Sequence, residues 1–509
     1  MSEYPFAHLE EATTSELQAA MASGQLTARR LAEMYLERIQ TLDKGGPALN
    51  SILEVNPDAL VVADALDQER RARGPRGPLH GIPLLLKDNI ATADHMQTTA
   101  GSLALLGSRP PRDAFVVSKL RDAGAVMLGK TNLSEWANFR STASSSGWSG
   151  RGGQSHNPYV LDRTPCGSSS GSAVAVAANL AAASLGTETD GSILCPASTN
   201  GVVGIKPTVG LTSRAGVIPI SHSQDTVGPF ARTVADAAIL LGAITGIDQR
   251  DPATQASADK FHSDYTQFLD RDGLRGARIG IPRQVYFGYS AKTDAIVNAA
   301  IEQMRSLGAE IIDPADIPTA RQISSSESED SVFLFEFKFD LNAYLADLLA
   351  SPVRSLADII AFNNAHAEEE LRYFGQDRLL QAQDTTSLDD PRYLAALDEN
   401  HRLSRQEGID AVMDEYKLDA LVMPTGSPAW CIDLVDGDHF LGASSQPAAL
   451  AGYPAISVPA GYTFELPVGI TFMGRAFSEP TLIKLAYAYE QATRVRRPPR
   501  YLPTVPYNA

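Results

Sequence analysis

The hydrophobic positions of the N-terminal segment repeat at the spacing of α-helices. Thr13 and Glu16 have the spacing of a capping box, in which each side chain bonds the backbone N–H of the other residue, ahead of an apolar stretch. After Thr27 the apolar residues recur three or four positions apart, at Ala32, Tyr35, Leu36, Ile39 and Leu42. Residues 58–71 continue the same pattern. This spacing places apolar side chains on one helical face, so the segment is predicted to be helical.

Short apolar runs then alternate with further helical patterns. Two runs, Pro83–Leu86 and Ala125–Leu128, are separated by a predicted helix at 115–123. Similar runs follow at 278–281, 310–312, 420–423, 455–458 and 469–472, with helices predicted at 293–307 and 481–493. Residues 332–413 show mainly helical patterns, and residues 324–330 form a polar run that predicts a solvated loop or a helix start. This alternation predicts an α/β domain in which helices cover a sheet with parallel strands.

Two Gly/Ser clusters interrupt the chain on either side of an apolar segment rich in Ala and Val. The first, Cys166–Ser172, reads C-G-S-S-S-G-S, and the second, Thr187–Ser192, reads T-E-T-D-G-S. Glycine lets the backbone approach a ligand closely, and serine hydroxyls supply nucleophiles. A flexible linker has a similar composition. The apolar segment 173–185 favours instead a buried helix between two glycine-bearing turns.

Several ordered motifs accompany these clusters. They are G-I-P-L-L-L-K-D-N at 81–89, G-K-T-N at 129–132, N-G-V-V-G-I-K-P-T at 200–208 and L-P-V-G-I-T-F-M-G at 466–474. Together with the clusters, they resemble the amidase signature family over nearly the whole chain. The motif sequences S-E-W-A-N-F-R at 134–140 and T-E-T-D-G-S at 187–192 are similar to those of the bacterial peptide amidases of that family, which remove the C-terminal amide of peptides.

The resemblance implies one amidase signature domain over residues 1–509, built on a mixed central β-sheet covered by helices. Its parts are expected to be N-terminal helices at 1–75, a catalytic core at 76–315, a helical insertion at about 320–413 and a C-terminal sheet and helix part at 414–509. The residues alone agree with this expectation, because no long Pro/Gly-rich linker separates domains.

The resemblance also assigns catalytic roles. It places the acyl-forming nucleophile at Ser192, a bridging hydroxyl at Ser168 and the proton acceptor at Lys87, with a cis peptide bond between Gly167 and Ser168. A serine hydroxyl needs a base within hydrogen-bonding reach. The residues themselves leave a Ser–His–Asp triad open, since such a triad can assemble through space, and His156 is the nearest histidine to the first cluster.

A lysine can accept a proton at neutral pH only when its pKa is far below the ordinary value of about 10.4. Burial lowers a lysine pKa, and Leu84–Leu86 would supply apolar walls for Lys87. Asp88 would oppose this shift if it faced the same site. Adjacent side chains of a strand point to opposite faces, so Asp88 need not do so.

Other residues are candidates for substrate binding. The backbone N–H groups of Thr189, Asp190, Gly191 and Ser192 form the expected oxyanion hole. Further along the chain, Asn138, Phe139 and Arg140 are candidates for the lining of a peptide cleft, although aromatic residues at helical spacing also suit a core.

The second cluster departs from the pattern T-D-T-G-G-S-I-R of many relatives. Here Glu188 replaces an acid one methylene shorter, Asp190 replaces a glycine and Leu194 replaces an arginine. An acid–arginine pair near the nucleophile is therefore lost. The carboxylate of Asp190 beside the nucleophile is expected to disfavour substrates that end in a free carboxylate.

Composition narrows the function further. The net charge of −17 argues against binding to a phosphate backbone. The three cysteines, Cys166, Cys195 and Cys431, have no metal-type spacing and suggest no disulfide framework. Cys166 and Cys195 are expected to serve as small packing residues. No metal or cofactor is expected. No apolar run is long enough for a membrane span, and no signal peptide is visible, so a cytoplasmic protein is expected; a periplasmic protein whose signal had been removed would show the same N-terminus.

The expected function is hydrolysis of the C-terminal amide of peptides to free acid and ammonia, with neither nucleic acid nor an obligate protein partner. The sequence leaves open other activities of the family. These are hydrolysis of other small amides, and an amidotransferase subunit that acts on glutamine with partner chains. A catalytically inactive binding protein is disfavoured, because Lys87, Ser168 and Ser192 are all present.

Overall fold

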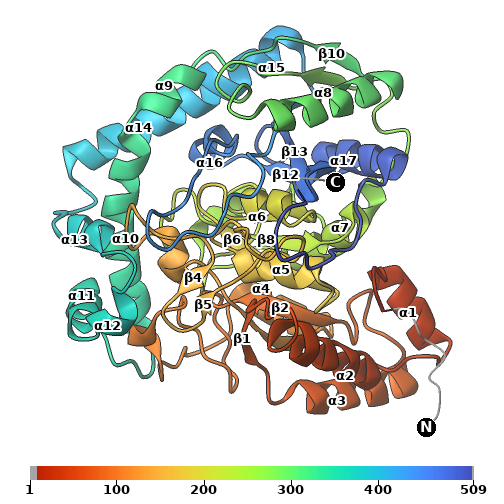
Figure 1. Cartoon of the computed structure of the whole chain (residues 1–509), viewed down its shortest axis with the longest axis vertical. Helices are drawn as coiled ribbons and strands as arrows, with labels where there is room; N and C mark the ends of the chain where they lie inside the picture. The colour runs from red at the N-terminus through yellow and green to blue at the C-terminus, as the bar shows by residue number, and fades with distance from the viewer. Residues whose placement is uncertain (1–8, 507–509) are drawn as a thin grey trace.

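The computed structural model describes residues 9–506, and one large mixed β-sheet runs through its centre (Figure 1). Its strands are β1 (Ile52–Val55), β2 (Pro83–Lys87), β3 (Val126–Thr131), β6 (Ala183–Glu188), β7 (Val203–Lys206), β8 (Thr226–Ala231), β9 (Arg278–Gly280), β10 (Glu310–Ile312), β11 (Ala420–Pro424), β12 (Ala455–Thr463) and β13 (Leu466–Met473). The strand order is β1-β3-β2-β6-β8-β7-β12-β13-β11-β9-β10. Strand β2 pairs in parallel with β3 and β6, whereas β8 and β12 pair with their neighbours in antiparallel fashion. A separate pair is formed by β4 (Trp148–Ser149) and β5 (Gly153–Gln154).

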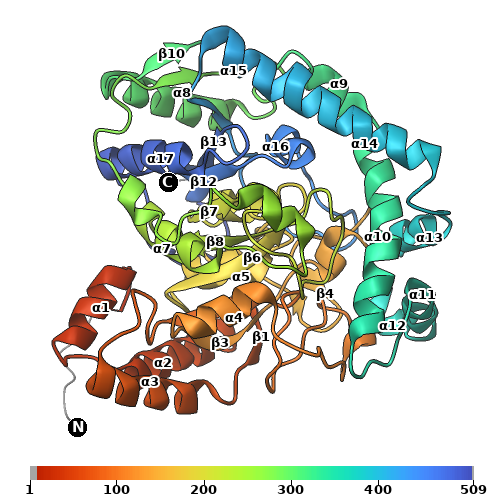
Figure 2. The same ribbon diagram turned by 180° about the vertical axis from the view of Figure 1, so that it is seen from behind.

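Helices cover both faces of this sheet (Figures 1 and 2). Strands β2, β3, β6, β7, β8, β11 and β13 are buried at every residue, which requires cover on both sides. The helices are α1 (Thr14–Ala22), α2 (Ala28–Arg38), α3 (Ala59–Arg73), α4 (Phe115–Asp122), α5 (Ser170–Ala177), α6 (Leu194–Thr199), α7 (Val234–Ile244), α8 (Ala291–Ser306), α9 (Ala320–Ser325), α10 (Ser328–Asp347), α11 (Leu356–Ala365), α12 (Ala367–Glu370), α13 (Asp377–Gln383), α14 (Pro391–Ser404), α15 (Asp410–Tyr416), α16 (Gln446–Ala451) and α17 (Glu479–Thr493). In the described range, none of these helices is long and apolar enough to cross a membrane.

The predicted helix starts at the N-terminus are confirmed. The Thr13 side chain accepts from the Glu16 N–H, and the Glu16 carboxylate accepts from the Thr13 N–H at 2.8 Å. The Thr27 hydroxyl accepts from the Arg30 N–H at 3.0 Å. Both hydroxyls satisfy backbone donors that a helix cannot pair internally. The predicted strands and the mainly helical segment also form, with boundaries shifted by a few residues.

The prediction of one buried helix over residues 173–185 is wrong. Helix α5 ends at Ala177, and β6 begins at Ala183. The break falls at Asn179, which has a left-handed backbone with φ of 57° that asparagine tolerates better than most residues. A run of small apolar residues has no polar face, so its periodicity cannot separate a buried helix from a buried strand.

The topology brings the two predicted site segments to one edge of the sheet. Strands β2 and β6 are parallel neighbours, with Leu86 paired to Leu185. Their carboxyl ends therefore lie together, one at Lys87 and the other at the turn that carries Ser192. Helices α9 to α15 form an arc along one side of the molecule (Figure 1), and α10 brings aromatic and acidic side chains to this edge.

Candidate active site

The amine of Lys87 is the centre of a buried polar cluster. It donates to Ser168 Oγ at 2.7 Å, to Thr187 Oγ1 at 2.8 Å and to the Thr187 carbonyl oxygen at 3.3 Å. Both Lys87 and Ser168 are fully buried. All three partners are neutral, so hydrogen bonding orients the amine without supplying a direct counter-charge.

Burial lowers the pKa of Lys87 to about 7, and the negative charges of Asp225 and Glu188 oppose this shift. A substantial fraction of the amine is therefore neutral at physiological pH. The neighbouring Asp88 faces elsewhere, as strand alternation allows, and accepts from the Thr99 N–H at 3.2 Å.

Two other lysines are fully buried, but their surroundings differ. Burial lowers the pKa of Lys130 and of Lys206 to about 8. Lys130 donates to the Ile90 carbonyl at 2.6 Å, and Lys206 donates to the Tyr453 carbonyl at 2.6 Å. Among these three lysines, only Lys87 contacts a hydroxyl of the Gly/Ser clusters.

The serines of the first cluster have separate structural tasks. Ser169 Oγ donates to the Thr187 carbonyl at 2.9 Å, and Ser172 Oγ donates to the Leu185 carbonyl at 3.0 Å. These bonds fasten the start of α5 to β6. The peptide bond between Gly167 and Ser168 is cis, as the family resemblance implied. The backbone N–H of Ser169 donates to the Ser192 carbonyl at 3.2 Å, so the two clusters are in direct contact.

A tight turn presents Ser192 at the surface of a cavity. Gly191 has φ of 74°, and a Cβ at this position would come within 2.9 Å of Ser445 Oγ, so the turn requires glycine. The Glu188 carboxylate accepts from the N–H groups of Ile193 at 2.6 Å and Leu194 at 2.9 Å. In this chain Glu188 therefore anchors the turn through backbone donors.

The four amides from Thr189 to Ser192 donate to no acceptor among the described residues. Unpaired N–H groups next to a serine hydroxyl are suited to binding the oxyanion of a tetrahedral intermediate. The arrangement can therefore combine a nucleophile, a neutral amine and preorganised N–H donors around one carbonyl carbon.

The cavity in front of Ser192 has a volume of about 710 Å³, which is in the range of small-ligand clefts. Most of the sequence-predicted binding residues line it, namely Asn138, Phe139, Thr189, Asp190 and Gly191. The cavity wall also includes residues from α10 and from the segment 430–445.

Arg140 is not among the residues that line this cavity. Its guanidinium is fully buried, donates to Glu135 at 2.6 Å and Glu370 at 3.3 Å, and lies 4.0 Å from the Phe374 ring centroid. These partners hold the guanidinium in the protein interior. The structure therefore gives no support to the predicted substrate contact of Arg140.

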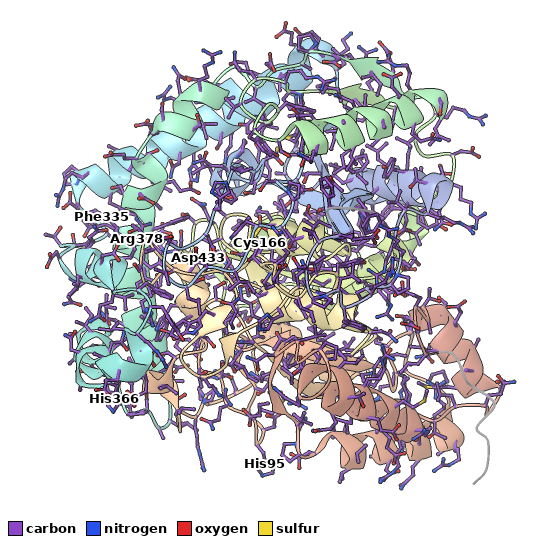
Figure 3. All side chains as sticks on the ribbon, viewed as in Figure 1. His95, Cys166, Phe335, His366, Arg378 and Asp433 are labelled. Carbon is purple, nitrogen blue, oxygen red and sulfur yellow. A yellow bond between two sulfur atoms is a disulfide. The ribbon has the colours of Figure 1, made fainter. Side chains whose placement is uncertain are left out.

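No histidine lines the cavity of Ser192 among the described residues. His156 uses its Nδ1 on the Leu161 carbonyl at 2.9 Å. His95 and His366 lie at the periphery of the molecule, whereas Cys166 lies at its centre (Figure 3). The alternative of a Ser–His–Asp triad at Ser192 is thus not formed.

Away from this cavity, three described residues bring together side-chain atoms of the kinds that bind metal ions. Atoms of His222, Glu336 and Asp340 lie within 4.8 Å of one another. They already bond each other, with His222 Nδ1 2.8 Å from Asp340 Oδ2. The group is an ion-pair network between a loop and α10, and it does not contribute to the lining of the cavity.

Sequence reasoning missed several residues of the cavity wall. Glu329 lies in the polar run that predicted a solvated loop or a helix start, yet its carboxylate accepts from Gln224 at 3.0 Å and Gln446 at 2.9 Å. Burial raises the pKa of Glu329 to about 8. Trp430 and Ser445 also line the cavity. These residues are far from the clusters in sequence, and no local pattern marks them.

The prediction that Cys166 and Cys195 are only small packing residues is wrong, because they form a disulfide with a Cα–Cα distance of 6.0 Å. Spacing gave no sign of it, because the two residues are 29 positions apart and meet only when α5 and β6 have formed. The bridge joins the residue before Gly167 to the second residue of α6, and Trp430 packs against it. It therefore ties both serine-bearing segments together.

The fold places a buried lysine–serine pair, Lys87 and Ser168, next to a turn that presents Ser192 to one cavity, an arrangement suited to a serine hydrolase. The chain belongs to the amidase family, which it matches over residues 30–483. It is therefore a hydrolase of amides, as the family and the solved structures of relatives support.

Individual relatives span nearly the whole chain. A probable amidase of Arabidopsis thaliana is 48% identical over 501 residues, which cover 97% of this chain and 92% of the relative. The glutamyl-tRNA(Gln) amidotransferase subunit of Halorhodospira halophila is 36% identical over 507 residues, with 95% and 98% covered. The solved structure of native peptide amidase from Stenotrophomonas maltophilia is 53% identical and superposes with a TM-score of 0.93, with 98% of this chain and 99% of that chain covered.

Removal of the disulfide should destabilise the protein, because the bridge restricts the unfolded chain. Replacing both Cys166 and Cys195 with serine should lower the free energy of unfolding by about 2–4 kcal/mol. Thermal unfolding followed by circular dichroism measures this effect. The exposed Cys431 is the matched control, and Cys431→Ser should leave the transition unchanged. Equal transitions for the double variant and the wild type would contradict the structural role of the bridge.

Proposed function

We propose that this chain hydrolyses the C-terminal carboxamide of peptides to a free acid and ammonia. The observation that carries the proposal is the position of Asp190. Its carboxyl group lies in the cavity wall two residues from Ser192, and its buried Oδ1 has no hydrogen-bond partner among the described residues. A carboxylate there can accept a hydrogen bond from a terminal NH₂ group, whereas it would repel a terminal carboxylate. The similarity to a solved peptide amidase supports the same choice.

In the proposed reaction, neutral Lys87 accepts a proton from Ser168, and Ser168 accepts the proton of Ser192. The Ser192 oxygen then attacks the amide carbon and forms a tetrahedral intermediate. The N–H groups of residues 189–192 stabilise the oxyanion, with a contribution of roughly 3–4 kcal/mol per donor. The relay returns a proton to the leaving nitrogen, so ammonia departs and an acyl-enzyme remains. A water molecule then gives a proton to the same relay and attacks the acyl-enzyme. The peptide acid is released, and the Ser192 hydroxyl is restored.

An amidotransferase subunit is the less supported candidate. The relative with that name from Halorhodospira halophila is 36% identical to this chain, whereas the solved peptide amidase is 53% identical. We therefore infer that the chain acts without an obligate protein partner. We also favour an oxidising compartment over the expected cytoplasm, because disulfides such as Cys166–Cys195 persist mainly where thiols are oxidised.

Mass spectrometry of a peptide amide after incubation tests the proposed function. A mass gain of about one unit, the difference between NH₂ and OH, is expected, together with one ammonia per peptide. Ser192→Ala should abolish this conversion and also covalent labelling by a fluorophosphonate. Its matched control is Ser170→Ala, whose hydroxyl donates to the Cys166 carbonyl at 2.6 Å and does not contact Lys87.

Two outcomes would contradict this account. Cleavage into shorter fragments would identify an endopeptidase. Full labelling of the Ser192→Ala variant would place the nucleophile at another serine.

The pH profile tests the role of Lys87. The reaction needs the neutral amine, and the pKa of Lys87 is lowered to about 7, so kcat/KM should rise as pH increases through about 7 and fall on the acid side. Lys87→Ala should lose several orders of magnitude in kcat, because the three residues act as a unit. Near-normal turnover of this variant, or a profile that is flat between pH 6 and 8, would exclude Lys87 as the proton acceptor.

A further inference from the structure

The cavity of Ser192 has a strongly acidic wall. Five acidic side chains line it, from Asp190, Glu329, Asp330, Asp436 and Asp438, and the only lysine or arginine among its lining residues is Arg378. Burial raises the pKa of Asp190 and raises that of Glu329 to about 8, so the negative charge of the wall comes mainly from its outer carboxylates. Arg378 is already used, because its two terminal nitrogens lie 2.6 and 2.7 Å from the oxygens of Asp330. Asp190, Asp436 and Asp438 form no ion pair among the described residues, so Arg378 and Asp330 are the only ion pair within this wall.

The outer part of this wall combines acidic and aromatic groups. Asp436, Asp438 and Phe440 follow Trp430 in one segment, and the rings of Trp430 and Phe440 pack edge to face with centroids 5.8 Å apart. Asp438 accepts only a backbone N–H, that of Ser146 at 3.0 Å, and Asp436 is exposed. Carboxylates next to aromatic rings favour an ammonium or guanidinium group.

A second observation at the same place points to a ligand that carries a hydrogen-bond acceptor. Trp430 is only 6% exposed, lines the cavity, and its indole N–H has no acceptor among the described residues. A buried N–H without a partner is unfavourable until a ligand supplies an acceptor. The first residues of a peptide offer both groups that are missing here, a positive charge for the carboxylates and a carbonyl oxygen for the indole.

We propose that this cavity selects peptide amides that carry a positive charge, and that Asp436 and Asp438 are the residues that determine this specificity. The inference rests on the proposed function and names its preferred substrate class. The charge can come from the free α-amino group of a short peptide amide or from a lysine or arginine side chain ahead of the amide.

The physical basis is charge complementarity in a partly enclosed site. Opposite charges attract more strongly there than in bulk water, so a cationic substrate gains affinity that a neutral one lacks. The net charge of −17 adds long-range attraction for cations, which salt should screen. The same wall also disfavours the free-acid product, which carries a new negative charge.

Two matched substrate pairs test the proposal. Glycyl-leucinamide with a free α-amino group is compared with its N-acetyl form, and N-acetyl-lysinamide is compared with N-acetyl-norleucinamide. Ammonia release gives kcat/KM for each. In the wild type, at least one pair should favour the charged member about tenfold, mainly through KM, and the pair that does so identifies the source of the charge. The preference should shrink as the salt concentration rises.

The variant Asp436→Asn/Asp438→Asn should reduce the preferred ratio severalfold toward one. Asp259→Asn/Asp389→Asn is the charge-matched control, because it removes two exposed carboxylates that do not line the cavity, and it should keep the wild-type ratio. Circular dichroism checks that each variant folds. If the double variant does not fold, Asp436→Asn alone, at an exposed position, replaces it and should also reduce the ratio.

Equal kcat/KM within both pairs for the wild type would overturn the inference and leave the proposed function intact. A ratio that is unchanged in the Asp436→Asn/Asp438→Asn variant, or equally reduced in the control, would also overturn it. If none of the four amides released ammonia, the proposed function itself would fail, and the inference would fall with it.

Discussion

The burial of one amine is the constraint on which the site depends. Lys87 lies at the end of a strand that is buried on both faces, and its pKa is lowered from 10.5 to about 7. At neutral pH, a shift of this size costs the folded state roughly 4 kcal/mol of stability. The rest of the fold must offset that amount, and the hydrophobic cluster that includes Leu84, Leu85 and Leu185 contributes to the offset.

The surroundings of the Lys87 amine avoid two unfavourable arrangements, a direct carboxylate partner and an entirely apolar pocket. A direct carboxylate partner would keep Lys87 protonated, and an entirely apolar pocket would leave its N–H groups unpaired. Here the hydroxyls of Ser168 and Thr187 satisfy the amine, while the carboxylates of Asp225 and Glu188 act only from a distance. Glu188 meanwhile holds the turn of Ser192 through two backbone amides. Glu188 thus influences both Lys87 and the turn of Ser192, the proposed base and the proposed nucleophile.

The sequence predicts those parts of the structure that depend on contacts between residues close together in the chain. The caps at Thr13 and Thr27 and most strands of the sheet were predicted, because apolar periodicity and side-chain hydroxyls act over a few residues. The family resemblance supplied the grouping of Lys87, Ser168 and Ser192, which the fold brings to one sheet edge.

What could not be predicted depends on contacts between distant segments. Strand β6 was not predicted, because it begins within a run of small apolar residues that suit a buried helix and a buried strand equally. The Cys166–Cys195 bridge forms between residues that α5 and β6 bring together, and the acidic wall of Glu329, Asp436 and Asp438 is assembled from α10 and the segment after Trp430. Arg140 was a candidate by its position next to Phe139, but buried carboxylates hold its guanidinium in the interior.

A direct titration of Lys87 tests the central claim, that this fold holds a neutral lysine beside Ser168. The protein is labelled with ¹³C-lysine, and the Cε resonance of Lys87 is assigned by its absence in Lys87→Gln. The account predicts a titration midpoint near pH 7, with the resonances of exposed lysines near their ordinary value of about 10.4. A Lys87 resonance that stays in its protonated position up to pH 10 would contradict the account.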